Sequence, residues 1–320
     1  MTFSIRMLAA RAALALSMAV PLSISNAQAT DPESCSPVRF SDVGWTDITA
    51  TTAVATTILN ALGYETDIKL LSVPVTYTSL KNGDIDIFLG NWMPTMEADI
   101  APYRDEGSVE TVRANLQGAK YTLATNAAGA ALGITDFASI ARHADALDGK
   151  IYGIEPGNDG NRLILDMIKQ NAFDLSAFQL VESSEQGMLA QVSRATRANQ
   201  PVIFLGWEPH PMNANFELTY LAGGDDVFGP DFGGATVFTN VRAGYVSECP
   251  NVGAFLGNLE FSLAMENEIM GAILNDGKDP ADAAATWLKA NPDALTGWLA
   301  GVTTHDGDDA AAAVKSALGL

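Results

Sequence analysis

The sequence predicts an α/β protein folded into two lobes, and three features support that prediction. Strand-like and helix-like segments alternate along the chain. Two cysteines, Cys35 and Cys249, stand far apart. An apolar run long enough for a buried strand occurs at 87–90 and again at 203–206; each copy ends in Gly and is followed by a Trp and then a Pro. Because open α/β sheets bind ligands where their strands end, each run is expected to present a ring at such an edge.

The repeated run favours two similar lobes, each offering a ring to something held between them. The first copy reads Ile-Phe-Leu-Gly-Asn-Trp-Met-Pro and the second Ile-Phe-Leu-Gly-Trp-Glu-Pro. Chance is the alternative, since a four-residue apolar match is common and Trp is often a core residue.

Residues 1–29 have the pattern of a secretory signal peptide. Arg6 and Arg11 give a positive start, residues 12–24 are mostly apolar, and Ala-Gln-Ala at 27–29 resembles a cleavage site. The apolar run is too short for a permanent membrane helix, and no lipid-anchor pattern with Cys follows directly. We therefore expect an exported, soluble mature chain that begins near Thr30.

The composition makes some partners poor candidates. The chain has 18 Lys and Arg against 38 Asp and Glu, a formal net charge of −20, and removal of Arg6 and Arg11 changes the balance to 16 minus 38, or −22. Nucleic acid and anionic lipid both need basic patches, so neither is an expected partner. The acidic field would attract cations, although acidity also serves solubility alone.

Cys35 and Cys249 are the only cysteines of the chain, and an oxidising compartment favours a disulfide between them. Closing so long a loop stabilises a fold by at most about 5 kcal/mol. The bond would place both residues in one lobe, so that the intervening chain leaves and returns. Two unpaired buried thiols are the alternative.

Each lobe is expected to contain a mixed, mostly parallel sheet flanked by helices, and the sheet of the first lobe should be covered on both faces. Its predicted elements are strands at 38–40, 66–73 and 84–90 and helices at 48–62, 75–81 and 94–103.

The pattern restarts near residue 118 and predicts a second lobe inserted into the first. The expected elements are strands at 121–125, 150–155 and 201–205, helices at 161–171 and 184–196, a turn-rich segment at 222–234, a strand at 235–240, and mainly helix beyond. Lobe 1 would then comprise 30–117 and 229–320, and lobe 2 would be 118–228. Two crossings make a hinge, which is the architecture of closure around a ligand.

No enzyme motif appears in the sequence. There is no Gly-x-Ser-x-Gly, His-Glu-x-x-His, phosphate-binding Gly-x-x-x-x-Gly-Lys or Cys-x-x-Cys. The three histidines are scattered, and Asp225, Asp226 and Asp231 fit no EF-hand spacing. We therefore expect a binding protein without catalytic residues, metal or cofactor.

Aromatic and polar residues recur where strands pass into the following segment. They are Trp45, Asp47, Trp92, Tyr121, Asn158 and Trp207. Several rings around one small site form a cage for a quaternary ammonium, whose charge is diffuse and donates no hydrogen bonds. At about 2 kcal/mol per desolvated ring, four rings would supply about 8 kcal/mol, which corresponds to a micromolar Kd if other costs cancel.

Two of these residues also have ordinary structural interpretations. Asp47 precedes an expected helix and would serve as its N-cap. In a ring cage its carboxylate would instead balance a cation and accept from a hydroxyl. Asn158 could simply form a turn, or it could hydrogen bond a neutral hydroxyl.

The chain resembles the periplasmic choline-binding proteins of ABC importers, within the wider glycine betaine/choline substrate-binding group. The likeness covers nearly all of the mature chain. It rests on Val-Gly-Trp-Thr-Asp at 43–47, Phe-Leu-Gly-Asn-Trp-Met-Pro at 88–94, Lys-Tyr at 120–121, Gly-Ile-Glu-Pro-Gly-Asn-Asp-Gly at 153–160 and Phe-Leu-Gly-Trp-Glu-Pro-His-Pro at 204–211.

The resemblance implies a periplasmic-binding-protein fold that closes on choline and delivers it to an inner-membrane permease as a monomer. By that likeness Trp45, Trp92, Tyr121 and Trp207 would surround the trimethylammonium group. Asp47 would supply the negative charge and Asn158 would hold the hydroxyl end. A Cys35–Cys249 bridge is also similar to that of the family.

Two rival functions remain open from the sequence. The same scaffold could bind glycine betaine or carnitine, with acetylcholine as a further choline-like ligand. Asp47 argues against a ligand carboxylate, because no Arg or Lys lies in the ring-bearing junctions. An exported hydrolase of quaternary-ammonium esters is the other rival, and it lacks a visible nucleophile.

Overall fold

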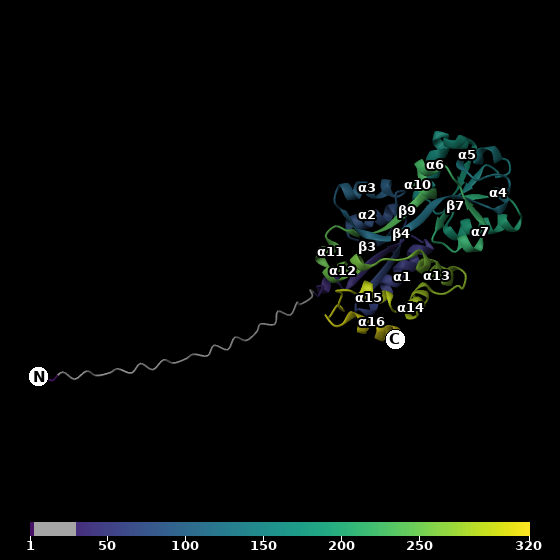
Figure 1. The fold of residues 1–320 in the computed structure, drawn as a ribbon. Coiled ribbons are helices and arrows are strands. Elements are labelled where there is room, and N and C mark those ends of the chain that lie inside the picture. The colour runs from purple at the N-terminus through teal and green to yellow at the C-terminus, as the bar shows by residue number, and fades with distance from the viewer. Residues whose placement is uncertain (3–29) are drawn as a thin grey trace.

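A computed structural model describes residues 1–2 and 30–320 of the chain, so nearly all of the expected signal peptide lies outside the described residues. Figure 1 shows two lobes, with β4 and β9 lying between them. One sheet continues through both lobes in the order β2-β1-β3-β9-β4-β7-β5-β6, and β8 pairs with β4. Its strands are β1 (Pro37–Asp42), β2 (Glu65–Leu70), β3 (Ile87–Met93), β4 (Val109–Asn126), β5 (Lys150–Tyr152), β6 (Gln179–Val181), β7 (Ile203–Glu208), β8 (Leu218–Tyr220) and β9 (Gly234–Arg242).

Helices cover the sheet in both lobes (Figure 1). Those of the first lobe are α1 (Thr46–Ala61), α2 (Val73–Asn82), α3 (Glu97–Asp105), α11 (Tyr245–Glu248), α12 (Pro250–Asn258), α13 (Leu263–Leu274), α14 (Pro280–Ala290), α15 (Ala294–Trp298) and α16 (Ala310–Leu318), with the 3-10 turn η1 (Glu33–Cys35). Those of the second lobe and its return are α4 (Ala127–Ala131), α5 (Phe137–Ile140), α6 (Asp159–Gln170), α7 (Glu185–Arg197), α8 (Met212–Asn215), α9 (Asp225–Phe228) and α10 (Pro230–Gly233), with η2 (Ala141–His143) and η3 (Ala172–Ala177). In the described part of the chain, no helix is both long enough and apolar enough to cross a membrane.

The two-lobed α/β architecture and the mixed sheet agree with the prediction, but parallel pairings do not outnumber antiparallel pairings among the described strands. Among the described strands, β1 pairs in parallel with β2 and β3, and β5 with β6 and β7. The pairings of β9 with β3 and of β4 with β7, β8 and β9 are antiparallel. The difference arises because the strands that cross between the lobes run against their neighbours.

β4 connects the two lobes as one continuous strand. The sequence predicts a strand only from residue 121, but β4 begins at Val109 and pairs with β9 as far as Lys120 before it pairs with β7. Gly118, at φ +77°, lies just before that change of partner. The turn-rich return folds as the short helices α9 and α10 and leads into β9. The lobe boundaries at 117/118 and 228/229 stay predictions.

Local signals in the sequence explain several element boundaries. Gly83 ends α2 in the left-handed conformation, which glycine adopts readily at a helix C-terminus. Ser184, a residue type that favours the N-cap position, caps α7 by accepting from the N–H of Gly187 at 3.1 Å. Pro94, by contrast, is not in the first turn of a helix, because α3 begins only at Glu97.

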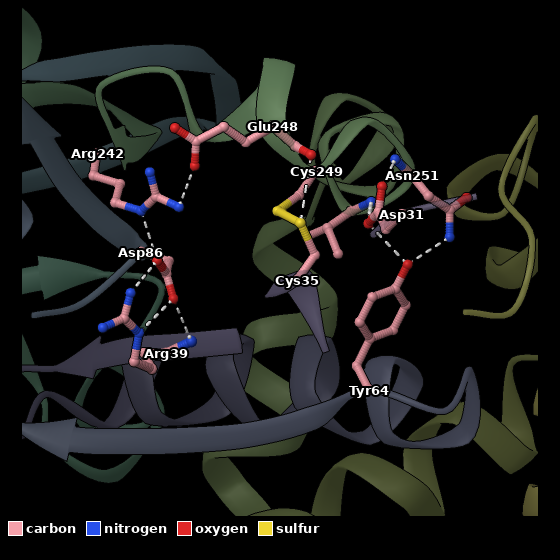
Figure 2. The surroundings of a disulfide bond; sticks show 10 residues. Asp31, Cys35, Arg39, Tyr64, Asp86, Arg242, Glu248, Cys249 and Asn251 are labelled. Carbon is pink, nitrogen blue, oxygen red and sulfur yellow. Dashed lines mark hydrogen bonds and ion pairs between the residues drawn. A yellow bond between two sulfur atoms is a disulfide. The ribbon is translucent and has the colours of Figure 1, made fainter. Parts of the chain in front are cut away.

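The predicted disulfide is present and ties the two ends of the chain within the first lobe (Figure 2). Cys35 ends η1, and Cys249 lies between α11 and α12. Beside it, Asp31 accepts from the hydroxyl of Tyr64 at 2.9 Å and from the N–H of Asn251 at 2.7 Å. The segment from Asp31 to Cys35 is therefore held to the start of α12 by a covalent bond and by buried hydrogen bonds.

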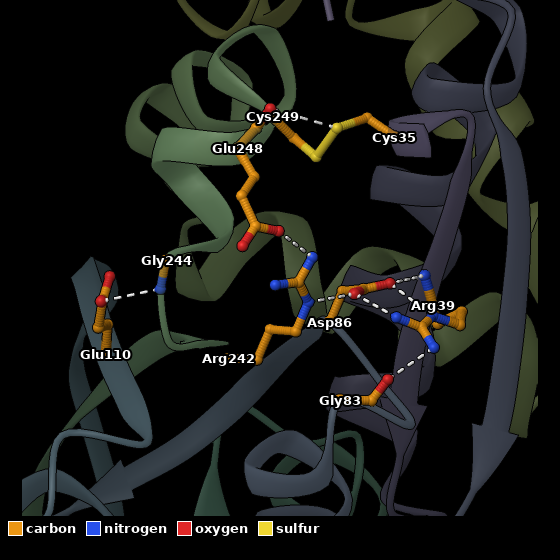
Figure 3. A network of polar contacts seen from close by, with 9 residues as sticks. All are labelled: Cys35, Arg39, Gly83, Asp86, Glu110, Arg242, Gly244, Glu248 and Cys249. Carbon is orange, nitrogen blue, oxygen red and sulfur yellow. Dashed lines mark hydrogen bonds and ion pairs between the residues drawn. A yellow bond between two sulfur atoms is a disulfide. The ribbon is translucent and has the colours of Figure 1, made fainter. Parts of the chain in front are cut away.

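A buried carboxylate joins three strands of the first lobe (Figure 3). Asp86, which precedes β3, accepts from the guanidinium of Arg39 on β1 and from Nε of Arg242 at the end of β9. Arg242 also pairs with Glu248 at 2.7 Å. These charge-assisted bonds fix the sheet at the amino ends of β1 and β3, opposite the ends where Trp45 and Trp92 lie.

Candidate ligand-binding site

One cavity between the lobes brings together all six residues that the sequence singles out. It encloses about 270 Å³ of space between protein atoms, part of which is open to solvent. Its described lining contains no Arg or Lys. The lining residues are Trp45, Asp47, Trp92, Tyr121, Ile154, Asn158, Asp159 and Trp207.

Trp92 and Trp207 reach the cavity from within strands, not from loops that follow them. The sequence predicts that each strand stops at Gly, but β3 runs on to Met93 and β7 to Glu208. Gly90 does not end β3 but allows close packing on it. A Cβ at Gly90 would lie 2.8 Å from the side chain of Ile48, so this glycine lets α1 pack closely on β3.

The four rings surround the cavity and are almost completely shielded from solvent. Their exposed fractions are 5% for Trp45, 4% for Trp92, 6% for Tyr121 and 3% for Trp207. Tyr121 lies centrally, with its ring centroid 6.0 Å from that of Trp92 and 6.3 Å from that of Trp207. The lobes are therefore closed over a small space with aromatic walls.

Asp47 faces this space and is not the N-cap of α1. The helix begins one residue earlier, at Thr46, and Trp45 occupies the N-cap position without a side-chain capping bond. The Asp47 carboxylate instead accepts from the indole N–H of Trp92 at 3.2 Å. The alternative interpretation of Asp47 as a cap is therefore wrong, because its side chain turns inward from the first turn of the helix.

Burial raises the pKa of Asp47 to about 8, and the nearby Glu185 carboxylate contributes. Backbone N–H groups and the Trp92 indole lower the pKa again, but only in part. Glu266 on α13 is also buried, and burial together with Asp47 raises its pKa well above the usual value. A cation in the cavity would favour the ionised form of Asp47, so the site is electrostatically suited to positive charge.

Asn158 both caps a helix and holds a ring of the cavity. Its Oδ1 accepts from the N–H of Asn161 at 3.1 Å, which caps α6, and from the hydroxyl of Tyr121 at 2.8 Å. Gly160 makes room for that hydroxyl, since a Cβ there would collide with Tyr121. The two interpretations of Asn158 are thus compatible in the structure.

Asp159 is a cavity residue that the sequence reasoning missed. Its exposed fraction is 1%, and its Oδ1 accepts from the amide of Asn158 at 3.1 Å. Burial raises the pKa of Asp159 to about 6, and the nearby Asp99 adds to this, whereas Thr95 and Arg162 lower it. The cavity therefore has a carboxylate from each side, Asp47 on α1 and Asp159 on α6.

Hydrogen bonds join the two lobes beside the cavity. The indole N–H of Trp45 donates to Glu155 at 2.8 Å. Glu185, the first residue of α7, accepts from the backbone N–H of Thr46 at 2.8 Å and from its hydroxyl. His210 lies 3.2 Å from the same carboxylate. The contacts of Trp45 and Thr46 join residues of opposite lobes, so they belong to the closed state.

An ion pair bridges the lobes on another side. The guanidinium of Arg162 on α6 donates to both carboxylate oxygens of Asp99 on α3 at 2.7 and 2.8 Å. It also donates to the carbonyl of Thr95 at 3.1 Å. Bidentate geometry and partial burial make this a stronger contact than a surface salt bridge.

The sequence reasoning also missed Glu155 and Glu185, in addition to Asp159. Asp159 and Glu185 each begin a helix, where an acidic residue is common because it complements the helix dipole. Glu155 lies in the same turn as Asn158. The partner of Glu155 across the cleft, Trp45, is not visible in the sequence.

Comparison with known proteins identifies the family. Residues 36–290 match the model for the substrate binding domain of an ABC-type glycine betaine transport system. The glycine betaine/carnitine transport binding protein GbuC of Listeria monocytogenes is 32% identical over 159 residues, which are 50% of this chain and 52% of GbuC. That match therefore spans about half of GbuC.

Solved structures agree with the family match. An ABC-transporter choline binding protein in complex with choline is 75% identical, with a TM-score of 0.89 over 90% of this chain and 100% of that chain. A choline binding protein in an unliganded semi-closed conformation is 76% identical, with a TM-score of 0.84 over the same shares. Lactococcal OpuAC complexed with glycine betaine, at 24% identity and a TM-score of 0.73, shares the fold over 82% of this chain and 98% of that chain. The chain therefore belongs to the family of substrate-binding domains of ABC-type glycine betaine transport systems.

Proposed function

We propose that this protein is the choline receptor of an ABC importer and captures choline by closing two lobes around it. The observation that carries the proposal is a cavity walled by four nearly buried rings and a carboxylate, with no Arg or Lys in its described lining. A quaternary ammonium fits such a site because it interacts with ring faces and needs no hydrogen bonds. The 75% identical relative is described in complex with choline.

Each predicted site residue has a role in this proposal. Trp45, Trp92, Tyr121 and Trp207 enclose the trimethylammonium group, and at about 2 kcal/mol per desolvated ring they supply about 8 kcal/mol. Asp47 balances its charge. Asn158 contacts the hydroxyl end from the opposite lobe.

Glycine betaine is the second candidate, favoured by the family description and by the OpuAC and GbuC relatives. The cavity disfavours it because a ligand carboxylate would face Asp47 and Asp159 without a described cationic lining residue to offset them. Acetylcholine keeps the cation and is the more acceptable analogue. We rank choline first, then acetylcholine, then betaine.

The proposal includes delivery to a membrane permease, export through a signal peptide at 1–29, residence in the periplasm, and action as a monomer. Support for a permease partner comes from the family, whose members serve ABC-type transport systems. No catalytic step is proposed, because the site offers rings and carboxylates for binding but no nucleophile paired with a base among its described lining residues.

Titration calorimetry of the mature protein with choline, acetylcholine and glycine betaine tests the proposal. Choline is expected to bind with a micromolar or tighter Kd and more tightly than betaine. If betaine binds more tightly than choline, the choline assignment is wrong. If none of the three binds, the quaternary-ammonium site itself is refuted.

A further inference from the structure

His210 is buried against Trp207 but is not among the described lining residues of the cavity. Its exposed fraction is 1%, and its ring meets that of Trp207 edge-on, with 4.8 Å between the centroids. Nδ1 of His210 accepts from the backbone N–H of Met212 at 2.9 Å. Because this nitrogen is an acceptor, the ring is neutral and its hydrogen is on Nε2, which lies 3.2 Å from Oε1 of Glu185. His210 therefore donates to Glu185.

The loop that carries His210 is held by contacts within the second lobe. The side-chain amide of Asn213 donates to the carbonyl of Trp207 at 2.8 Å and to that of His210 at 2.9 Å. The amide oxygen of Asn213 accepts from the hydroxyl of Tyr220 at 2.8 Å. No partner in the first lobe is needed to hold the imidazole in place, so its position does not depend on closure.

The carboxylate of Glu185, in contrast, has donors from both lobes. Thr46 supplies a backbone N–H and a hydroxyl from the first lobe, and His210 supplies its N–H from the second. When the lobes separate, the Thr46 donors are lost, and His210 is the donor that remains among the described contacts. A side chain that must be ordered at closure costs rotamer entropy, and one that is already oriented avoids part of that cost.

We propose that His210 is a positioning residue for ligand capture, which holds the Glu185 carboxylate in the orientation that caps α1 at Thr46 when the lobes close. Thr46 is flanked in the chain by Trp45 and Asp47, so the contact ends between two residues of the cage. This inference rests on the proposed function, because it assumes that the closed lobes retain choline.

Two substitutions separate the roles of the two ring nitrogens of His210. Glutamine places an amide N–H near the position of Nε2, where it can donate to Glu185, but it removes the acceptor for Met212. Asparagine keeps an acceptor for Met212 near the position of Nδ1, but its side chain is too short to reach Glu185. His143→Asn changes a half-buried histidine of the same lobe and is the matched control. Choline affinity is measured by titration calorimetry, and the Tm is measured without ligand.

The two variants should differ in opposite directions for binding and for stability. His210→Asn should weaken choline binding about tenfold, whereas His210→Gln should stay within about threefold of the wild type. The Tm should fall further in His210→Gln, because only that variant loses the bond to Met212. His143→Asn should keep the wild-type affinity. Equal losses of affinity in the two His210 variants, or a greater loss in His210→Gln, would make His210 a structural residue and overturn the inference.

A double-mutant cycle with Glu185→Ala tests whether His210 acts through Glu185. Once the carboxylate is removed, His210→Asn should change choline affinity by less than about twofold. A loss that adds in full would mean that His210 acts through its contact with Trp207, and it would overturn the inference.

The position of the ring hydrogen tests the same contact without any ligand. Long-range proton–nitrogen NMR of the wild type should place the hydrogen of His210 on Nε2, and a hydrogen on Nδ1 would overturn the inference. If the wild type binds no quaternary ammonium while His210 carries its hydrogen on Nε2, the proposed function fails and the orientation of Glu185 by His210 stands.

Discussion

Glu185 caps the first helix of the opposite lobe through Thr46. Its carboxylate accepts from the backbone N–H of Thr46 at 2.8 Å and from the Thr46 hydroxyl, although the two residues are 139 positions apart. The first four N–H groups of any helix lack partners within it, so a carboxylate is well placed there. Here that carboxylate comes from α7, and the N-terminus of α1 is capped by its side chain only when the lobes close.

Glu185→Gln should therefore weaken the closed state without altering the cage. An amide keeps one acceptor oxygen but loses the charge that strengthens the bonds to Thr46, and hydrogen bonds to charged groups contribute about 1.5–3 kcal/mol. We expect choline to dissociate about tenfold faster, measured by stopped-flow tryptophan fluorescence. Glu217→Gln, an exposed change in the same lobe, is the matched control. An unchanged dissociation rate would show that this contact does not hold the lobes closed.

Asp47→Asn should weaken choline binding yet stabilise the ligand-free protein. The pKa of Asp47 is raised to about 8 in the folded protein from a usual 3.8, so the folded state binds more protons between these values. The stability associated with protonated Asp47 is thus present at low pH and is lost as the pH rises through 8. The Tm gain of the variant should be larger at pH 9 than at pH 5, and about 3 °C or more at the higher pH.

Choline affinity gives a second measurement on the same variant. Because a bound cation favours ionised Asp47, wild-type affinity should fall as the pH is lowered from 9 to 6, whereas Asp47→Asn should bind weakly with little pH dependence. A wild-type affinity that is flat over this range would contradict the role of Asp47.

Replacement of a single cage ring should weaken choline binding and leave the fold intact. For Trp92→Ala and Trp207→Ala we expect losses of about 1–2 kcal/mol or more, roughly five- to thirtyfold in Kd. Trp287 on α14 is the matched control. It stacks on Trp298 away from the cavity, so Trp287→Ala should lower the Tm but keep the affinity. Unchanged affinity in both cage variants, by calorimetry, would make these rings structural.

Loss of the disulfide should affect stability and not binding. Cys35 and Cys249 close a loop of 214 residues in the first lobe, and neither lines the cavity. The double variant Cys35→Ser/Cys249→Ser should lose up to about 5 kcal/mol of unfolding free energy in guanidinium titrations. Its Kd for choline, measured where the variant is folded, should stay within about twofold of the wild type. A larger change in Kd would mean that the bond also sets the geometry of the cleft.

Much of the fold could be predicted because its signals are local. Gly83, Ser184 and the alternation of apolar segments identify helices and strands from neighbouring residues alone. The first half of β4 could not be predicted, because 109–117 is largely polar or half-exposed and becomes a strand by pairing with β9, more than a hundred residues later. A mixed sheet was expected, but which strands pair antiparallel could not be assigned, for the same reason.

The candidate site, like the fold, could be predicted only in part. The six residues that meet at the cavity were visible as aromatic and polar groups near strand ends. Asp159 and Glu185 were hidden by an ordinary local explanation, since acidic residues are common in first turns of helices, and Glu155 lies in the turn that precedes α6. What distinguishes them is a partner in the other lobe or an unpartnered buried oxygen, and both depend on tertiary packing.

A crystal structure of the mature protein at saturating choline tests the central claim most directly. The account predicts the trimethylammonium group among Trp45, Trp92, Tyr121 and Trp207, beside Asp47, with the hydroxyl directed towards Asn158. Choline bound outside these rings, or bound among them with its hydroxyl directed away from Asn158, would contradict it.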